Sequence, residues 1–392
     1  MTTQREGRWL YPLLAVVATA GFFYVNIMPA IVDGLVTGLG FSNPQAGMIG
    51  AANIYGASVG SFLAIFLVGR LRWRPTLAVL FCVLIAIDLA SIAIRDPMVL
   101  VAVRAVHGIV GGTAVGISYS VIARTHSPDR AFGMLLLVQF GLGGLGVMLL
   151  PGLVPVYGTQ VLFLSLAALT VVALAALPTI RIAPTTPATA PVTKAVPAAM
   201  LALARIRRHA IATLALLALF LFQAGNMAMA AFIIGLGEHY GLARDFISQA
   251  LGWATWVGAT GAILVIVIGI RYGRLRPLLV AGALTLAGCT LFLESGNGWL
   301  FFIANVGTAI TWSFVVPYLF GMLSALDGSG RMAALGGFAS KLGLASGPLA
   351  AGWLVRGGDF PLLIIVSVVV IAASVAAATA AALRIDRKES IA

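Results

Sequence analysis

Charged side chains are scarce in this sequence. Only 9% of its 392 residues are aspartate, glutamate, lysine or arginine, whereas about a quarter are charged in soluble domains. Hydrophobic residues make up 61% of the chain, and the mean hydropathy is +1.06. This composition excludes a water-soluble protein and predicts one that is embedded in a membrane.

Cysteine and histidine are also rare. The two cysteines, Cys82 and Cys289, lie in apolar runs, so we expect no disulfide and interpret them as buried thiols that fill space. The four histidines are scattered and lack the spacing of metal ligands, so we expect no metal and no cofactor. No Ser–His pair, metal triad or carboxylate pair shares a depth in the apolar segments, which argues against an enzyme.

Long apolar segments are what the sequence has in abundance. They run for about 20 residues, the length that a transmembrane helix needs, and they do not alternate as the strands of a membrane barrel do. The sequence therefore predicts an all-α integral membrane protein. Its twelve predicted spans are 10–35, 46–68, 76–95, 98–122, 131–155, 159–180, 210–236, 247–270, 277–295, 299–324, 332–355 and 360–383.

The net charge of +12 comes from basic residues in short loops rather than from a continuous basic face, so we expect no nucleic-acid partner. An even number of spans places both termini on one side. Of the 24 lysines and arginines, only Arg95, Arg244 and Arg356 then fall in loops of the other side, while Arg104 and Lys341 fall inside spans. Because basic loops stay inside, we predict cytoplasmic termini in a bacterial-type inner (plasma) membrane.

The longest interruption of the apolar pattern, 181–209, is rich in proline, threonine and alanine and ends in a basic stretch. It predicts a cytoplasmic linker between an N-terminal bundle, 1–180, and a C-terminal bundle, 210–392, with six spans each. The two halves share a short motif: G-R-L-R follows the second span at 69–72 and the eighth span at 273–276. Each copy leads through an Arg-Pro step into the next helix, which indicates an internal repeat.

Arg104 lies inside the fourth apolar span, where a cation costs roughly 3 kcal/mol on insertion scales. Asp88 lies at a matching depth in the preceding span, and Asp33 lies near the outer end of the first. Arg104 thus either forms an ion pair that only ties helices together, or it binds an anionic substrate group, or a proton competes with it for the partner carboxylate. His107 is one helical turn away and suits either proton coupling or a polar lining.

Lys341 lies near the middle of the eleventh span, and no carboxylate of the second half lies at that depth. It is therefore the best candidate for a ligand of a substrate anion. The alternatives are a lysine that bonds to carbonyl groups near Gly347 and Pro348, or one that is deprotonated.

Twelve spans in two halves with basic connectors resemble the major facilitator superfamily of secondary transporters. The segment R-A-V-H-G-I-V-G-G at 104–112 resembles the R-x-x-Q-G-x-G pattern of that family. The connectors resemble its G-x-x-x-D-R-x-G-R-R loop, although Gly69 and Ile270 stand where acids are usual. The connector residues that carry the likeness are Gly69, Arg70, Arg72 and Arg74 in the first copy and Gly273, Arg274 and Arg276 in the second.

This resemblance implies two pseudo-symmetric six-helix bundles that open a central site to each side in turn. It also implies that the first, fourth, seventh and tenth helices line the site. Besides Arg104 and His107, their candidate lining residues are Tyr24, Asn26, Tyr119, Gln223, Asn226, Asn305, Trp312 and Tyr318. For proton coupling or gating, the candidates are Asp33, Asp88 and His107.

The leading hypothesis is a transporter that moves a small organic anion, an aromatic or other carboxylate, coupled to protons or to a counter-anion. The alternative is a proton-coupled efflux antiporter of drugs or amphipathic metabolites, and a third hypothesis is a membrane scaffold or receptor without solute flux. The expected partners are a small-molecule substrate and the lipid bilayer, and we expect a monomer.

Overall fold

The computed structural model describes residues 9–67, 71–125, 128–180, 198–269, 271–326 and 331–389, and these residues are almost entirely helical. The helices before residue 181 are α1 (Leu10–Ala20), α2 (Phe23–Asn26), α3 (Met28–Leu39), α4 (Asn43–Leu67), α5 (Trp73–Ser91), α6 (Pro97–Ile122), α7 (Pro128–Tyr157), α8 (Gln160–Ala176) and the 3-10 helix η1 (Leu177–Thr179). The later helices are α9 (Ala198–Ala231), α10 (Ile233–His239), α11 (Arg244–Gly258), α12 (Thr260–Ile268), α13 (Leu275–Leu291), the 3-10 helix η2 (Phe292–Glu294), α14 (Gly298–Leu326), α15 (Arg331–Leu354) and α16 (Phe360–Glu389).

Ten of the predicted spans coincide with helical segments that are long and apolar enough to cross a membrane. The predicted first span consists of α1, α2 and α3, and the predicted eleventh span is α15, which is less apolar than the ten because it carries Lys341 and several glycines and serines. The predicted all-α membrane fold is confirmed, whereas the count of twelve crossings stays a prediction for these two segments.

The predicted first span is not one continuous helix but is interrupted at two places. One break lies at Gly21 and Phe22, and another at Ile27, directly before α3. Pro29 lies in the first turn of α3, where its missing N–H leaves no helix hydrogen bond unmade. The three short helices on either side of these breaks all pack against α7, and α1 also contacts α6.

The stretch predicted as a linker is partly helical. Its residues 181–197 lie outside the described residues, but α9 begins at Ala198 and continues without interruption to Ala231. The basic end of the stretch is therefore part of the long helix that forms the predicted seventh span. Cys82 also differs from expectation, because it is exposed on the outside of the bundle while Cys289 is buried.

Close packing of α4 on α6 organises the first half. A Cβ atom at Gly108 of α6 would overlap with the carbonyl oxygen of Asn53 in α4, so only glycine allows these backbones to approach as they do. In the second half, α9 packs against both α15 and α16.

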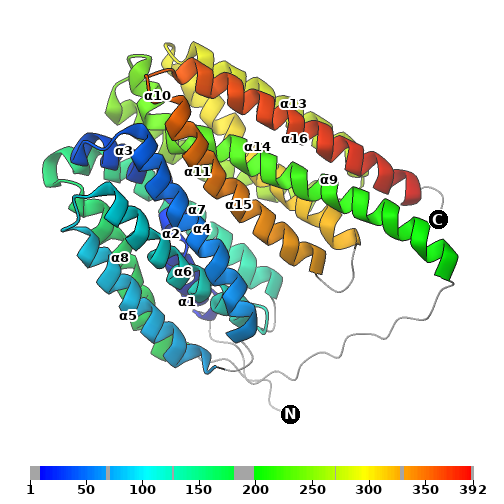
Figure 1. The fold of residues 1–392 in the computed structure, drawn as a ribbon, viewed down its shortest axis with the longest axis horizontal. Helices are drawn as coiled ribbons and strands as arrows, with labels where there is room; N and C mark the ends of the chain where they lie inside the picture. The colour runs from blue at the N-terminus through cyan, green and yellow to red at the C-terminus, as the bar shows by residue number, and fades with distance from the viewer. Residues whose placement is uncertain are drawn as a thin grey trace.

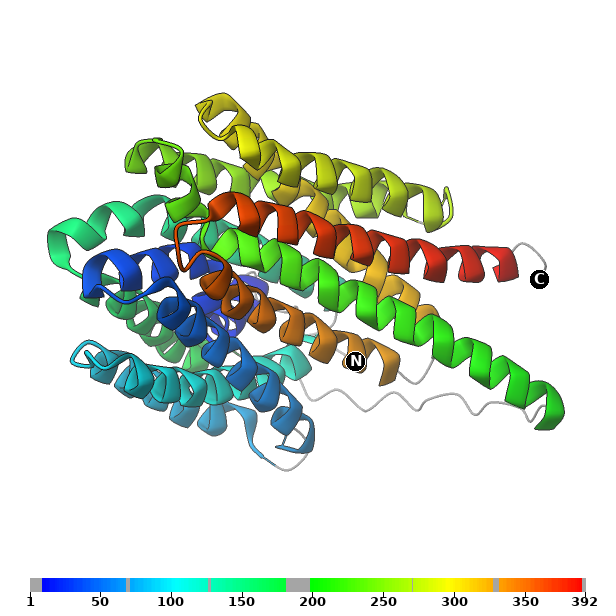
Figure 2. The ribbon, with the colours of Figure 1, turned by 45° about the horizontal axis from the view of Figure 1, so that its top comes forward.

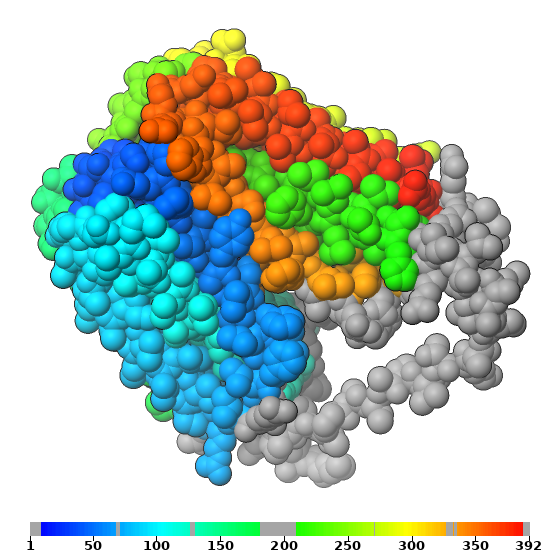
Figure 3. Space-filling view, in the orientation of Figure 1, coloured from blue at the N-terminus to red at the C-terminus, as the bar shows by residue number. Residues whose placement is uncertain are grey.

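The two halves are joined at one end and separate at the other. One buried core includes Ile31 of α3, Val147 of α7, Ile247 of α11 and Leu363 of α16, and so it spans both halves at the predicted outer end. Toward the predicted cytoplasmic end, two further cores lie one in each half. The ribbons diverge toward this end, where α9 and α16 extend away from α4 and α5 (Figures 1 and 2). The space-filling view shows the same separation of the coloured helices (Figure 3).

Two helix pairs, α4 with α15 and α7 with α11, make most of the seam between the halves, and α3 adds smaller contacts with α9 and α10. The contacts of a side chain that reaches across this seam depend on how the two halves are arranged.

Candidate functional site

A fully buried ion pair lies in the first half. Arg104 of α6 donates from Nη1 to Asp88 Oδ1 of α5 over 2.8 Å, and both side chains have no exposed surface. Nη2 donates to the carbonyl oxygen of Ile87 over 3.2 Å and to the hydroxyl of Ser91, while the guanidinium lies 5.2 Å from the ring centroid of Phe163. The contact predicted from matching depth is present, and the Asp88 carboxylate neutralises Arg104 in this conformation.

His107 joins the same pair. Its Nε2 lies 3.2 Å from Asp88 Oδ1, and its Nδ1 lies 2.8 Å from Nδ2 of Asn53. Asn53 also donates to the carbonyl oxygen of Arg104 over 3.3 Å, and the ring of Tyr24 lies 6.2 Å from that of His107. Asn53 was not among the residues predicted from the sequence, although an amide in the middle of an apolar segment indicates a polar partner. It is buried in the structure.

A second group of polar residues bridges the two halves, and we call it the central cluster. Gln223 of α9 donates from Nε2 to the hydroxyl of Ser340 over 2.7 Å and accepts at Oε1 from Trp312 Nε1 over 2.7 Å. Phe140 of α7 lies edge-on to Trp312 with ring centroids 6.3 Å apart. The central cluster comprises Ser61, Phe140, Gln223, Trp312, Ser340 and Lys341.

Lys341 is the charged member of the central cluster. It directly follows Ser340 in α15 and is half-buried, and its Nζ donates to Ser61 Oγ of α4 across the seam. Among the described residues, Lys341 forms no ion pair with a carboxylate. Ser61 also donates to the carbonyl oxygen of Gly112 over 3.1 Å, so the partner of the ammonium is itself held in place.

A third charged group closes the predicted outer end. Asp33 of α3 accepts from Arg244 of α11 at both carboxylate oxygens, over 2.6 and 3.2 Å, and Arg244 Nη2 lies 2.7 Å from Glu238 Oε1. The sequence leaves Asp33 open as an alternative partner of Arg104, but the structure pairs Asp33 with Arg244. The sequence signal was available, because Arg244 is one of only three cations in the predicted outer loops.

The remaining predicted lining residues lie elsewhere. Asn26 bonds to the carbonyl oxygen of Gln139, Asn226 and Asn305 bond back to carbonyl groups of their own helices, and the hydroxyl of Tyr318 donates to the carbonyl oxygen of Gly269. Tyr119 lies edge-on to Phe132. Of the predicted lining residues, the structure thus groups Gln223 and Trp312 with Ser340, which directly precedes Lys341 in α15, and it places Tyr24 and His107 near Arg104.

Comparison with known proteins identifies the family. A model described as Major Facilitator Superfamily matches residues 13–242, which is more than half of the chain. The chain belongs to the Major Facilitator Superfamily. Comparison by sequence with curated proteins gives no match.

Solved transporters of this superfamily share the fold over nearly the whole chain. A variant of the nucleoside transporter NupG has a TM-score of 0.71 at 13% identity, covering 96% of this chain and 99% of NupG. A bacterial homologue of the human lysosomal transporter Spinster, in an inward-facing and unoccupied conformation, has a TM-score of 0.70 at 13% identity and covers 98% of both chains. The D-xylose-proton symporter has a TM-score of 0.67 at 17% identity, covering 94% of this chain and 96% of the symporter.

The connectors that resemble the superfamily loop are anchored differently in the two halves. Gly69 and Arg70 lie outside the described residues, while Arg72 is exposed and Arg74 donates to the carbonyl oxygen of Ile180. In the second copy, the backbone N–H groups of Arg274 and Leu275 both donate to Asp386 Oδ2 over 3.0 Å. Gly273 has a φ of 69°, and Arg276 is exposed. Asp386 of α16 thus supplies a carboxylate to a connector whose own sequence lacks one.

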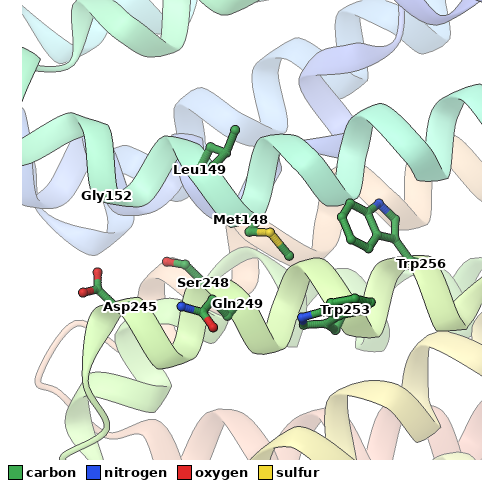
Figure 4. A pocket seen from close by; sticks show the side chains of 8 residues that line it. All are labelled: Met148, Leu149, Gly152, Asp245, Ser248, Gln249, Trp253 and Trp256. Atoms are coloured by element: carbon green, nitrogen blue, oxygen red, sulfur yellow. The ribbon is translucent and has the colours of Figure 1, made fainter.

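A hollow lies on the seam between α7 and α11 (Figure 4). It has a volume of about 390 Å³ and is lined by Met148, Leu149, Gly152, Asp245, Ser248, Gln249, Trp253 and Trp256. None of these residues belongs to the central cluster, so this α7–α11 groove is a separate feature.

Proposed function

We propose that this superfamily member is a secondary transporter of a small organic anion and that Lys341 is the ligand of the anionic group. The observation that carries the proposal is that Lys341 forms no ion pair with a carboxylate among the described residues, while its Nζ bonds to Ser61 across the seam. A half-buried cation inside a bilayer is costly without a counter-charge, and an anionic substrate would supply it.

The surroundings of Lys341 fit a small aromatic or other carboxylate. Trp312 and Phe140 offer aromatic surface, while Gln223 and Ser340 offer groups for polar atoms of the substrate. Lys341 and Trp312 belong to the second half, whereas Ser61 and Phe140 belong to the first. A substrate held by both halves would bind with an affinity that depends on how the halves are arranged, which alternating access requires.

The charged groups of the first half support a coupling role in this proposal. His107 and Asp88 are 3.2 Å apart and fully or nearly buried, so a proton taken up there would change the ion pair with Arg104. Asp33 supports a gating role, because its pairing with Arg244 joins the halves at one end only. We do not place Arg104 among the substrate ligands, because Asp88 already neutralises it.

The proposed arrangement in the membrane follows the sequence analysis. We propose a monomer in a bacterial-type inner membrane with both termini cytoplasmic, built from an N-terminal bundle, 1–180, and a C-terminal bundle, 210–392. Separation at the end that carries the termini would make this an inward-open conformation. The Spinster homologue with a similar fold is described as inward-facing, which is consistent with this proposal.

Matched aromatic probes test the substrate class. Purified wild-type protein and the Lys341→Gln and Lys341→Arg variants are each titrated with benzoate, benzyl alcohol and benzylammonium, and the thermal unfolding temperature is measured. We expect benzoate alone to stabilise the wild type and the Lys341→Arg variant, and Lys341→Gln to lose at least about tenfold in apparent affinity, since bonds to charged groups contribute about 1.5–3 kcal/mol.

Flux in proteoliposomes completes the test. Lys341→Gln should abolish benzoate counterflow, and Asp359→Asn, at an exposed acid of the predicted outer end, should leave it intact. Stabilisation and transport of benzylammonium driven by an imposed pH gradient, with no response to benzoate, would instead establish the efflux alternative.

A further inference from the structure

We propose that the α7–α11 groove is a binding site for a membrane lipid with a primary ammonium headgroup, of the phosphatidylethanolamine class, in the leaflet of the predicted outer side. This site is separate from the proposed substrate site and does not depend on it.

The groove opens toward lipid. Leu149 of α7 and Trp253 of α11 are 50% and 53% exposed, and neighbouring Leu145 and Val257 on the same helices are also exposed. In a membrane such surfaces contact acyl chains. The occupant of a hollow between them is therefore drawn from the bilayer itself and not from water.

The lining changes from polar to apolar along the groove (Figure 4). Asp245 lies one residue after the start of α11 at the predicted outer end, and Gln249 follows one turn deeper. Trp253 lies eight residues beyond Asp245, or roughly 12 Å along the helix at 1.5 Å per residue. Met148, Leu149 and the two tryptophans, whose rings meet edge-on at 5.2 Å, make the deeper part. This order matches a polar headgroup above an acyl chain.

The polar end accepts hydrogen bonds and carries negative charge. Asp245 is exposed and forms no ion pair with any residue that the structure describes, because the adjacent Arg244 is directed at Asp33 and Glu238. Ser248 is buried and its hydroxyl donates to the carbonyl oxygen of Arg244, so Asp245 and Gln249 are left for a ligand. The lining contains no lysine or arginine, which disfavours an anionic headgroup.

These groups distinguish one zwitterionic headgroup from another by its ammonium. A primary ammonium has N–H donors for the Asp245 carboxylate and the Gln249 carbonyl, whereas the quaternary ammonium of choline has none. The groove therefore selects ethanolamine over choline lipids as well as over anionic lipids.

Lipid retention measured by native mass spectrometry tests this assignment. The full-length protein is purified from an equimolar mixture of phosphatidylethanolamine, phosphatidylcholine and phosphatidylglycerol with identical acyl chains. We expect retained lipid to be enriched at least about fivefold in phosphatidylethanolamine, and we expect Asp245→Asn and Gln249→Leu each to remove that enrichment. Trp253→Ala should lower the total lipid retained.

The control is Glu294→Gln, which neutralises another exposed acid of the predicted outer end outside the groove and should leave the enrichment unchanged. Both Asp245 and Gln249 are exposed, so their substitution leaves the packed interior intact. Equal retention of the ethanolamine and choline lipids by the wild type, or enrichment that persists in both groove variants, would overturn the proposal.

Discussion

The carboxylate of Asp33 and the guanidinium of Arg244 form a two-point ion pair across the seam between the halves, although 211 residues separate them in the chain. Asp33 is buried, Arg244 is 21% exposed, and Glu238 contacts the same guanidinium. In the alternating access that we propose, opening of the predicted outer end would break this pair, so the pair would stabilise the conformation described here relative to one that opens at that end.

Asp33→Asn and Arg244→Gln should therefore each shift the protein toward the opposite-facing conformation. Hydrogen bonds to charged groups contribute about 1.5–3 kcal/mol, which corresponds to a population change of about 10- to 100-fold. Spin labels at the exposed positions Thr37 and Gly357 report the change as a longer distance across the predicted outer end. An Asp33→Arg/Arg244→Asp exchange should restore the short distance in part, and an unaltered distance distribution in both single variants would contradict this role.

Removal of only one partner of the buried Arg104–Asp88 pair should destabilise the folded protein. Asp88→Leu leaves Arg104 as an uncompensated charge and is expected to cost about 3–5 kcal/mol of unfolding free energy. The double variant Asp88→Leu/Arg104→Leu should recover most of this loss, because it removes both charges. Thermal unfolding in detergent measures the effect.

The same double variant separates structure from binding. If Arg104 serves only to tie α6 to α5, the double variant keeps its affinity for benzoate even where proton coupling is lost. A loss of benzoate affinity in a double variant of normal stability would return Arg104 to the substrate ligands.

Replacement of Gly47 in α4 by alanine should disturb the packing of α4 against α15. A Cβ atom there would overlap with the carbonyl oxygen of Pro348 in α15, at the seam of the predicted outer end. Gly47→Ala should lower the thermal stability and lengthen the Thr37–Gly357 label distance. The matched control is Gly307→Ala in α14, where a Cβ atom meets nothing within 4 Å and alanine should stabilise the helix by about 1 kcal/mol.

An apolar contact should close the predicted cytoplasmic end in the alternate conformation. Tyr55 of α4 bonds to Ser346 of α15 across the seam, and Phe62 lies two helical turns further along α4 on the same face. Phe338 lies eight residues before Ser346 on α15, and both phenylalanines are exposed, at 54% and 43%. A Phe62→Cys/Phe338→Cys pair in a Cys82→Ser background should form a disulfide, lose transport when oxidised and regain it on reduction.

A Phe62→Cys/Leu284→Cys pair serves as the control, because Leu284 is exposed on α13, which does not belong to the α4–α15 seam. Equal cross-linking of the two pairs would show that Phe62 and Phe338 do not meet. In the superfamily loop that the connectors resemble, acidic residues are usual at two positions where this chain has Gly69 and Ile270. The apolar contact between Phe62 and Phe338 would take the place of a charged contact made by those acids.

The amino-acid sequence by itself determined the class of protein, ten helices that are long and apolar enough to cross a membrane, and the presence of charged residues within the apolar segments. It did so because the need for about 20 apolar residues per crossing is a local property that can be counted along the chain. Matching depth on adjacent antiparallel helices was also sufficient to predict the partnership of Arg104 with Asp88, since that pair lies within one half.

Only the tertiary structure decided which residues of different halves contact one another. Arg244 as the partner of Asp33, Ser61 as the contact of Lys341, and the α7–α11 groove all arise where helices of different halves approach one another. Apolar side chains face lipid and protein alike in such a chain, so hydrophobicity does not reveal which faces meet. That choice depends on glycine contacts and on pairings between residues hundreds of positions apart.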